Sequence, residues 1–332
     1  MPEPSPSPKR RGRRLLRFGA ACVVLSAVAG YVVVQYVTGG ADDPGCRVVS
    51  GTADGTAYEF TPEQAVNAAT IAAVGTDRDM PERAVAIALA TAIQESGLRN
   101  LAHGDRDSLG LFQQRPSQGW GTVKQVTDPA YAADIFYEHL AKVPDYTELP
   151  LTVAAQRVQR SGYPEAYAKH ESDAVLLAAA LTGTSAATLT CDGRVATATS
   201  TGPAAVRAAL VRDFGRDALE EDSQAKDAEK TSASADDDVP AAETNGRTVT
   251  LPVSRETTAA GRSVRERGWQ LAHWAVANAS ALHIERVSYA GREWTAGNTD
   301  SQWRAAGSSS TEAAGASGSG GGTGSVRIVT GQ

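Results

Sequence analysis

The sequence predicts a mainly α domain over residues 58–192 and a small α+β domain over residues 246–332, after one N-terminal transmembrane helix. Residues 18–37 carry no charged side chain and are long enough to cross a hydrocarbon core of about 30 Å. Between residues 61 and 183, apolar segments are bounded by helix caps and helix-stopping residues. In the last third of the chain, strand-like segments flank one apolar helix.

The N-terminal segment predicts a single-pass membrane anchor. Residues 1–17 are proline-rich and then strongly basic, so the positive-inside rule places them in the cytoplasm and the bulk of the chain outside the cell membrane. A cleaved signal peptide is the alternative, because Ala27-Val28-Ala29 has a small-x-small form. That site lies inside the apolar run, which favours an uncleaved anchor followed by a linker over residues 38–57.

Charge and cysteine content narrow the function classes. The formal net charge is −6 and the pI is about 5.5, which argues against a nucleic-acid partner. Of the three cysteines, Cys22 lies in the membrane segment, while Cys46 and Cys191 flank the mainly α domain. In an oxidising compartment these two can form a disulfide; the alternative is two unrelated thiols.

Cap residues define the helices of the mainly α domain. Thr61 and Gln64 form a capping-box pattern at the start of the first helix, and Gly75 is expected to stop it. The second helix is expected from residues 79–81 to residue 95 or 96, with Gly97 as its C-cap. Three later helices are expected over residues 128–144, from residue 152, and over residues 164–183.

The second helix ends on a lone glutamate, Glu95. On a helical wheel Glu95 shares a face with Ala84, Ala88 and Thr91, a face that points inward in an amphipathic helix. Partial burial and a position in the last helical turn both raise the pKa of a carboxyl group. A glutamate with a raised pKa suits a general acid for glycosidic-bond cleavage. The pattern alone also fits a surface glutamate near a C-cap.

Two segments around Glu95 carry a family resemblance. Residues 94–100 read QESGLRN and residues 108–114 read SLGLFQQ. In this order they resemble the signature of the lysozyme-like lytic transglycosylases of bacterial cell walls, with Phe112 in the position of a methionine. The resemblance extends over residues 60–182, and it implies a lysozyme-like fold for the mainly α domain.

Two further segments bear on this resemblance. Asp128-Pro129 opens a tyrosine-containing helix that is similar to the next helix of the family. Residues 160–167 fall where the family has a Tyr-Asn-Ala-Gly stretch, but the asparagine is absent. This segment therefore departs from the family pattern.

The resemblance implies a mechanism with one carboxyl group. Glu95 would protonate the glycosidic oxygen between N-acetylmuramic acid and N-acetylglucosamine, and would then act as base toward the muramyl 6-hydroxyl to give a 1,6-anhydro end. Hydrolysis with two carboxylates is the other route, with Asp105 or Asp107 as the second group. The segment GDRDS is also typical of a turn, which favours ordinary loop aspartates.

The resemblance also suggests how the sugar is bound. Gly110 would let the backbone approach the sugar closely, and Gln113 would form hydrogen bonds with its polar groups. Aromatic rings at Trp120, Tyr163 and Tyr167 either stack on sugars or pack in the core. The expected substrate-binding residues are Ser96, Gly110, Gln113, Trp120, Tyr163 and Tyr167. No cofactor and no metal are expected, since the lone loop histidine His103 is a weak ligand or base candidate.

The C-terminal third divides into a linker and a small domain. Residues 193–245 form an acidic low-complexity segment, with one short helix expected over residues 203–213. The small domain has strand candidates over residues 247–253, 284–295 and 326–329, a helix within residues 261–282 and a Ser/Gly-rich insert over residues 307–324. This order is β-α-β-β in outline.

The small domain is similar to the C-terminal half of the D-alanyl-D-alanine carboxypeptidase-like zinc peptidases. Thr250 and either Arg327 or Ile328 stand where that family has an aspartate and a histidine ligand, so no zinc site is expected. The domain is then either a metal-less module, for example a wall-binding one, or an unrelated small α+β domain.

These features favour a membrane-anchored, extracytoplasmic lytic transglycosylase or muramidase that acts on the glycan strands of peptidoglycan. The alternative is a non-catalytic protein that binds wall glycan or serves as a scaffold. The intact Glu95-Ser96 pair favours the enzyme, whereas the missing asparagine and the ligand-free C-terminal domain favour the scaffold. The sequence identifies no protein partner.

Overall fold

A computed structural model describes residues 45–52, 55–163, 165–193, 201–215, 243–253, 261–298, 302–307 and 324–331. These residues belong to one compact unit, Pro44–Gln332. The expected cytoplasmic tail and membrane helix lie outside the described residues, as do most of the acidic linker and the Ser/Gly-rich insert. Within the described ranges, no helix combines the length and apolar character that a membrane span requires.

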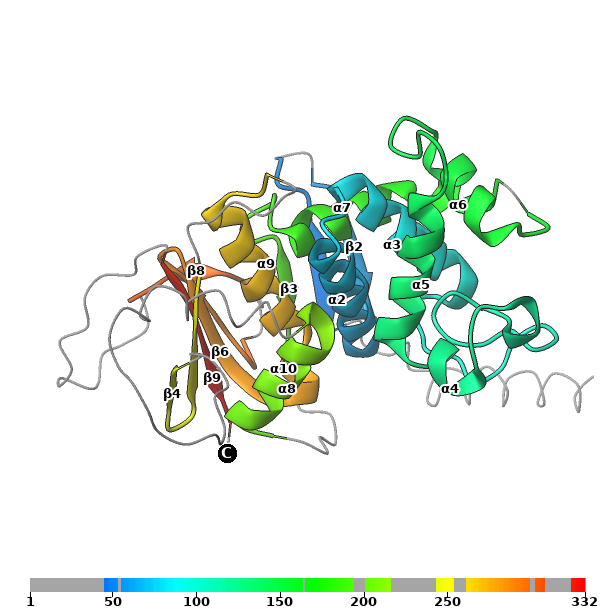
Figure 1. Cartoon of the computed structure of the whole chain (residues 1–332). Coiled ribbons are helices and arrows are strands. Elements are labelled where there is room, and N and C mark those ends of the chain that lie inside the picture. The colour runs from blue at the N-terminus through cyan, green and yellow to red at the C-terminus, as the bar shows by residue number, and fades with distance from the viewer. Residues whose placement is uncertain are drawn as a thin grey trace, which may run out of the picture. The chain divides into compact units, whose positions relative to one another are not determined.

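Helix α3 (Glu82–Ser96) lies at the centre of the helical part (Figure 1). It packs against α2 (Pro62–Asp77), α5 (Pro129–Ala141), α6 (Leu151–Gln159) and α7 (Glu171–Thr182). Its residues from Ala84 to Ile93 are all buried, because small alanines let neighbouring helices approach from every side. Glu95 therefore lies in the last turn of a helix whose middle is buried on every side.

The caps predicted from the sequence define the first two helices, except at Gly75. Thr61 and Gln64 form the capping box of α2, and Gly97 ends α3 in the left-handed conformation at φ +62°. Helix α2 continues through Gly75 to Asp77, so the expected stop is wrong. A Cβ at Gly75 would lie 2.6 Å from the ring of Tyr137 on α5, so this glycine makes room for a packed aromatic ring.

The last expected helix is also shorter than predicted. The segment from residue 165 forms a turn and a 3-10 helix (Ala168–His170), and α7 begins only at Glu171. Tyr167 thus precedes α7 instead of lying within it. A short helix, α4 (Val123–Val126), was not predicted; Asp128 caps α5 as expected, accepting from the amides of Ala130 and Tyr131.

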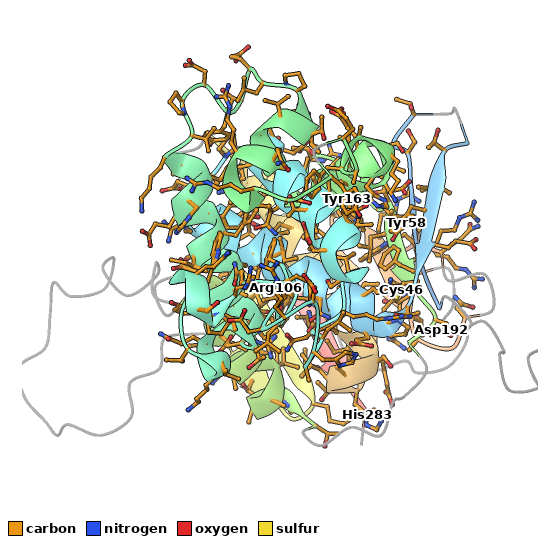
Figure 2. All side chains as sticks on the ribbon, turned by 90° about the vertical axis from the view of Figure 1, so that its right-hand side faces the viewer. Cys46, Tyr58, Arg106, Tyr163, Asp192 and His283 are labelled. Atoms are coloured by element: carbon orange, nitrogen blue, oxygen red, sulfur yellow. A yellow bond between two sulfur atoms is a disulfide. The ribbon has the colours of Figure 1, made fainter. Side chains whose placement is uncertain are left out.

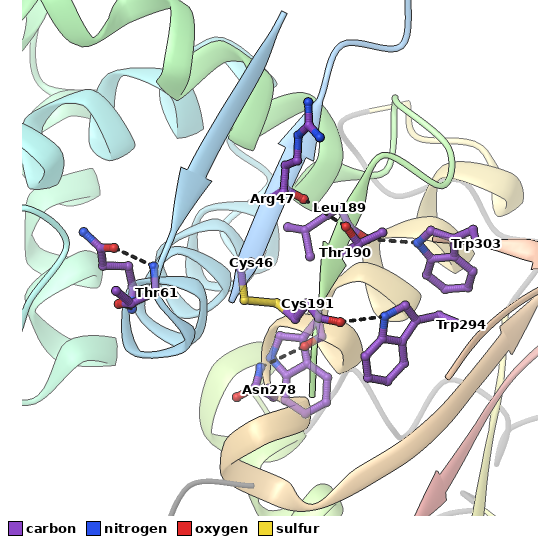
Figure 3. Close-up of a disulfide and its surroundings, with 11 residues drawn as sticks. Cys46, Arg47, Thr61, Leu189, Thr190, Cys191, Asn278, Trp294 and Trp303 are labelled. Atoms are coloured by element: carbon purple, nitrogen blue, oxygen red, sulfur yellow. Dashed lines mark hydrogen bonds between the residues drawn. A yellow bond between two sulfur atoms is a disulfide. The ribbon is translucent and has the colours of Figure 1, made fainter. Parts of the chain in front are cut away.

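A three-stranded antiparallel sheet joins the two ends of the helical part. It contains β1 (Cys46–Val49), β2 (Ala57–Phe60) and β3 (Leu189–Cys191) in the order β2-β1-β3. Cys46 lies opposite Cys191 across β1 and β3, and the two form the predicted disulfide (Figure 3). The sequence did not predict this sheet, because its strands are short and two of them are far apart in the chain.

The C-terminal part is a six-stranded antiparallel sheet in the order β4-β5-β9-β6-β7-β8. The strands are β4 (Glu243–Asn245), β5 (Thr248–Pro252), β6 (Ile284–Tyr289), β7 (Arg292–Thr295), β8 (Arg304–Ala305) and β9 (Ser325–Thr330). Helices α9 (Val264–Ala277) and α10 (Ala279–Leu282) follow β5. The predicted β-α-β-β outline is confirmed, and the short edge strands β4 and β8 were not predicted.

Helix α9 lies between this sheet and the helical part, where it contacts β6 and β9 on one side and α2 and α7 on the other (Figure 1). The buried His273 of α9 bonds to the carbonyl of Ala180 through Nδ1, at 2.7 Å, and accepts from the amide of Thr188 at Nε2, at 3.2 Å. Burial lowers the pKa of His273 to about 4, so the imidazole is neutral at physiological pH.

Tryptophans complete the contact at β3. The indole N–H of Trp294 donates to the carbonyl of Cys191 at 3.0 Å, and that of Trp303 donates to Leu189 at 2.9 Å (Figure 3). The predicted short helix is present as α8 (Pro203–Phe214). Its buried Asp213 accepts from Trp274 of α9 and Thr70 of α2, so the helical part and the C-terminal sheet share one interior.

Candidate active site

The end of α3 is tied to the glutamine-containing loop that the sequence singled out. The Ser96 hydroxyl lies 2.7 Å from the carbonyl oxygen of Leu111 and 3.0 Å from that of Ala92, within donating distance of both. It therefore joins the last turn of α3 to the segment 108–114. Ser96 was predicted to bind substrate; in the structure its hydroxyl contacts backbone carbonyls and positions the adjacent glutamate.

Glu95 is half-buried, and two side chains act on its carboxyl group. The hydroxyl of Tyr167 donates to Glu95 Oε1 at 2.7 Å, and the side chain of Gln159 favours the ionised carboxylate as well. Burial raises the pKa of Glu95 above its ordinary value of about 4.5, and these two side chains oppose that rise only in part. The carboxyl group therefore keeps its proton to higher pH than an exposed glutamate.

Tyr167 has a different role from the one expected. Its ring is fully buried, so it offers no face for a sugar, and the core-packing alternative holds. Its hydroxyl instead points at Glu95. Burial, followed by the negative charge of Glu95, raises the pKa of the phenol well above its usual range, so Tyr167 remains a proton donor.

Replacing Tyr167 with phenylalanine is expected to raise the pKa of Glu95 further. The hydrogen bond favours the ionised carboxylate, so its loss favours the protonated form. The carboxyl ¹³C chemical shift of labelled glutamate, followed against pH by NMR, measures this directly. Tyr163→Phe is the control, because Tyr163 is 78 % exposed (Figure 2) and should leave the titration unchanged. An unchanged or lowered midpoint in Tyr167→Phe would contradict this account.

Gln159 is the site residue that sequence reasoning missed. It ends α6, where its amide donates to the carbonyl of Phe112 at 2.8 Å, and it lowers the pKa of Glu95. This side chain thus joins α6 to the segment 108–114 and also acts on the glutamate. A polar residue at the end of an amphipathic helix is typical of a surface position, so the hydrophobic periodicity of α6 did not predict a role for Gln159 in the site.

The segment 108–114 folds back on itself beside α4. Gly110 pairs with Leu101, and Leu109 with Gln114, in two isolated antiparallel bridges. Gly110 has φ +75°, and a Cβ there would lie 2.1 Å from the carbonyl oxygen of Val126. The close approach that requires glycine is therefore to α4; an approach to sugar stays a prediction. Gln113 is half-buried, and its amide donates to the carbonyl of Gly110 at 3.2 Å.

Gly110→Ala is expected to lower the free energy of unfolding by about 2–4 kcal/mol, because an alanine there meets both a left-handed backbone and a fixed carbonyl. Gly119→Ala is the matched control. Gly119 also has positive φ but has no atom within 4 Å of an added Cβ, so a loss of only about 1 kcal/mol is expected. Urea unfolding curves measure both, and equal losses would contradict the contact with α4.

Asp105 and Asp107 lie in a turn, as the segment GDRDS predicted. Asp107 accepts from Arg115 Nε and from the amide of Ser117, both at 2.9 Å, and these bonds hold the pKa of its carboxyl far below its usual range. Asp105 is exposed and lies 4.0 Å from Arg106 Nε. His103 is exposed as well. Among the described residues, no group of three or more His, Cys, Asp or Glu side chains is placed to hold a metal ion.

A cavity of about 660 Å³ opens between the ends of α5 and α6, and we call it the α5–α6 cavity. Its polar and aromatic lining residues are Gln118, Trp120, His139, Lys142, Arg157, Gln159 and Arg160. Trp120 is half-buried and stacks on His139 with ring centroids 4.4 Å apart. Gln159 lines the cavity and also lowers the pKa of Glu95, so this side chain relates the cavity to the glutamate, which is not itself a lining residue. Of the predicted aromatic residues, Trp120 lies in this cavity.

The two positions at which the zinc peptidases would have their ligands lie side by side in the C-terminal sheet. Thr250 of β5 is paired with Arg327 of β9, so these positions are adjacent on neighbouring strands, as a shared ligand site would need. Neither a threonine hydroxyl nor a guanidinium is among the ordinary protein ligands of zinc. The residues present therefore do not fit a zinc ion.

Comparison with known proteins gives one family match. The model described as "VldE, C-terminal domain" matches residues 229–315, less than half of the chain. This range takes in β4, β5, α9, α10, β6, β7 and β8, and it does not include Glu95. No curated protein matches the chain.

Proposed function

We propose that this protein cleaves the glycan strands of peptidoglycan between N-acetylmuramic acid and N-acetylglucosamine, as a lytic transglycosylase or a muramidase. The observation that carries the proposal is the environment of Glu95. A half-buried carboxyl group with a raised pKa lies in the last turn of a buried helix and accepts a hydrogen bond from Tyr167, and Gln159, which acts on its pKa, lines a polar cavity. A raised pKa is the property that a general acid for glycosidic-bond cleavage needs.

The geometry supports a mechanism with one carboxyl group. Protonated Glu95 donates its proton to the glycosidic oxygen, and the bond from that oxygen to C1 of the muramyl residue breaks. Tyr167 stabilises the carboxylate as it forms, since its hydroxyl donates to it, and Gln159 also favours the ionised form. The carboxylate then removes the proton of the muramyl 6-hydroxyl as that oxygen bonds to C1, which restores protonated Glu95 and leaves a 1,6-anhydro end.

Two further observations support the proposal. Although the asparagine of the 160–167 segment is absent, a neighbouring amide side chain, that of Gln159, acts on the carboxyl group of Glu95. Asp107 accepts hydrogen bonds from Arg115 and from the amide of Ser117, so its carboxylate is already used within the loop. This favours the transglycosylase route over hydrolysis with two carboxylates.

The disulfide supports a position outside the cytoplasm. Disulfides persist in oxidising compartments, and Cys46–Cys191 closes almost the whole helical part. Together with the uncharged segment 18–37, this favours a single-pass protein with its N-terminus in the cytoplasm and its bulk facing the wall.

Digestion of purified peptidoglycan by the full-length chain tests the proposal. Soluble products are separated and weighed, with Glu95→Gln as the control. Anhydro-muropeptides that disappear in the variant support a transglycosylase, and reducing ends that disappear support a muramidase. If neither protein releases products but both sediment with the wall, the catalytic proposal fails and the alternative, a glycan-binding or scaffold protein, is favoured.

A further inference from the structure

The α5–α6 cavity carries positive charge without a matching carboxylate. Lys142, Arg157 and Arg160 all line it, and in the described part of the chain no aspartate or glutamate does. Lys142 is partly neutralised, because its ammonium group lies 2.6 Å from Glu138 on the same helix. The two arginines therefore contribute most of the uncompensated charge.

Neither guanidinium group is engaged by another side chain that the structure describes. Across the described ranges, no ion pair or hydrogen bond is found for the side chains of Arg157 and Arg160, and both residues are exposed. Elsewhere arginines of the same unit are paired, as Arg83 with Glu171 at 2.9 Å and Arg115 with Asp107 at 2.9 Å. A guanidinium left free in a cavity is available to form a bidentate contact with an anion.

The two arginines flank the residue that connects the cavity to the glutamate. Gln159 lies between them in sequence and lines the same cavity, and its side chain lowers the pKa of Glu95. Both positive charges are therefore carried by sequence neighbours of a side chain that acts on the glutamate. Trp120, stacked on His139 in the same lining, provides a flat apolar surface beside them.

We propose that the α5–α6 cavity binds a carboxylate group of the muramyl substrate, with Arg157 and Arg160 as its counter-ions. This inference rests on the proposed function and names the substrate class that the site prefers: anionic muramyl glycan over neutral glycan. Two sources supply the same chemistry, namely the free carboxylates of the peptide stem and the lactyl carboxyl group of a muramic acid that carries no stem.

Binding by the full-length Glu95→Gln chain tests this preference without cleavage. Three ligands are titrated by calorimetry: a disaccharide with its peptide stem, the same disaccharide with a free lactyl group, and a neutral N-acetylglucosamine oligomer. Replacing both arginines with glutamine is expected to weaken the binding of an anionic ligand about tenfold and leave the neutral oligomer unchanged. The tenfold difference should shrink at high salt, because exposed charges are screened.

The ligand arms distinguish the two sources of carboxylate. A loss for the stem-bearing disaccharide alone assigns the arginines to the stem carboxylates, and a loss for the stem-free disaccharide alone assigns them to the lactyl carboxylate. A loss for both anionic ligands means that the arginines accept either carboxylate. Arg292→Gln on β7 is the control, since it removes one exposed arginine outside the cavity and should change nothing.

Three results would overturn the inference: equal weakening for the neutral oligomer, no weakening for either anionic ligand, or no binding of any ligand. Failure of the proposed function looks different. It appears as intact peptidoglycan after incubation with the wild-type chain, whereas the binding preference is measured on a variant that need not cleave.

Discussion

Glu95→Gln is expected to lower the rate of glycan cleavage by about 10²–10⁴-fold, the usual contribution of a general acid. Glutamine keeps the shape and can still accept from Tyr167, which lies 2.7 Å from Oε1, but it has no proton to give to the glycosidic oxygen. Initial rates of soluble muropeptide release measure the effect. Glu148→Gln, at an exposed position, should retain the wild-type rate.

The same substitution is expected to make the fold more stable at neutral pH. Because burial raises the pKa of Glu95, the folded state keeps this proton at pH values where the unfolded chain has lost it. The contribution of Glu95 to stability is thus fully present below pH of about 4.5 and is lost as the pH rises through the raised pKa. Glutamine does not titrate, so Glu95→Gln should gain relative to wild type above that window and not below it.

Melting temperatures of both proteins across pH 4–8 test this sign. A difference that grows with pH and then levels off agrees with a buried glutamate whose pKa is raised. A variant that is less stable than wild type at neutral pH would show instead that the ionised carboxylate stabilises the fold, which contradicts the assignment of Glu95 as a poised acid.

Replacing Cys46 and Cys191 together with serine is expected to lower the free energy of unfolding by about 2–5 kcal/mol. The bond joins residues 145 positions apart, so it restricts a long loop of the unfolded chain. It also fixes the pairing of β1 with β3. The backbone carbonyls of β3 accept hydrogen bonds from the indole N–H groups of Trp294 and Trp303 (Figure 3). Denaturant unfolding gives the change in free energy.

Cys22→Ser is the matched control for the disulfide variant, because it removes a thiol from the uncharged segment 18–37 and leaves the disulfide in place. It should unfold as the wild type does. A reducing agent should reproduce the loss in wild type and have no effect on the double variant. Equal stability of the double variant and wild type would mean that hydrogen bonds and packing alone hold the sheet β2-β1-β3.

Local signals in the sequence predicted most of the helical fold. Thr61, Gln64, Gly97 and Asp128 cap helices where they were expected to, because capping depends on residues within one turn. The prediction at Gly75 was wrong, because a glycine is needed there to make room for the ring of Tyr137 on another helix and not to end α2. The sheet β2-β1-β3 was missed for a related reason: its pairing depends on contacts across the chain.

In the candidate site, too, local features were predicted and contacts between distant parts of the chain were not. Glu95 was predicted from its helical face and its neighbours in sequence, and the structure finds it half-buried with a raised pKa. Tyr167 was expected either to stack on a sugar or to pack in the core. It packs in the core, and its hydrogen bond to Glu95 was not predicted, because sequence does not show where a buried hydroxyl points. Gln159 and the charged lining of the α5–α6 cavity arise from the folding of α6 against segment 108–114 and the end of α5.

The most direct test of the central claim compares the pKa of Glu95 with the pH dependence of cleavage. NMR titration of the labelled carboxyl group gives the pKa in the free protein, and kcat/KM for peptidoglycan fragments against pH gives the pKa of the group that must be protonated. We predict a midpoint above 4.5 that coincides with the alkaline limb of the rate profile. A midpoint at or below 4.5, an alkaline limb that does not follow Glu95, or no cleavage at any pH would contradict the account.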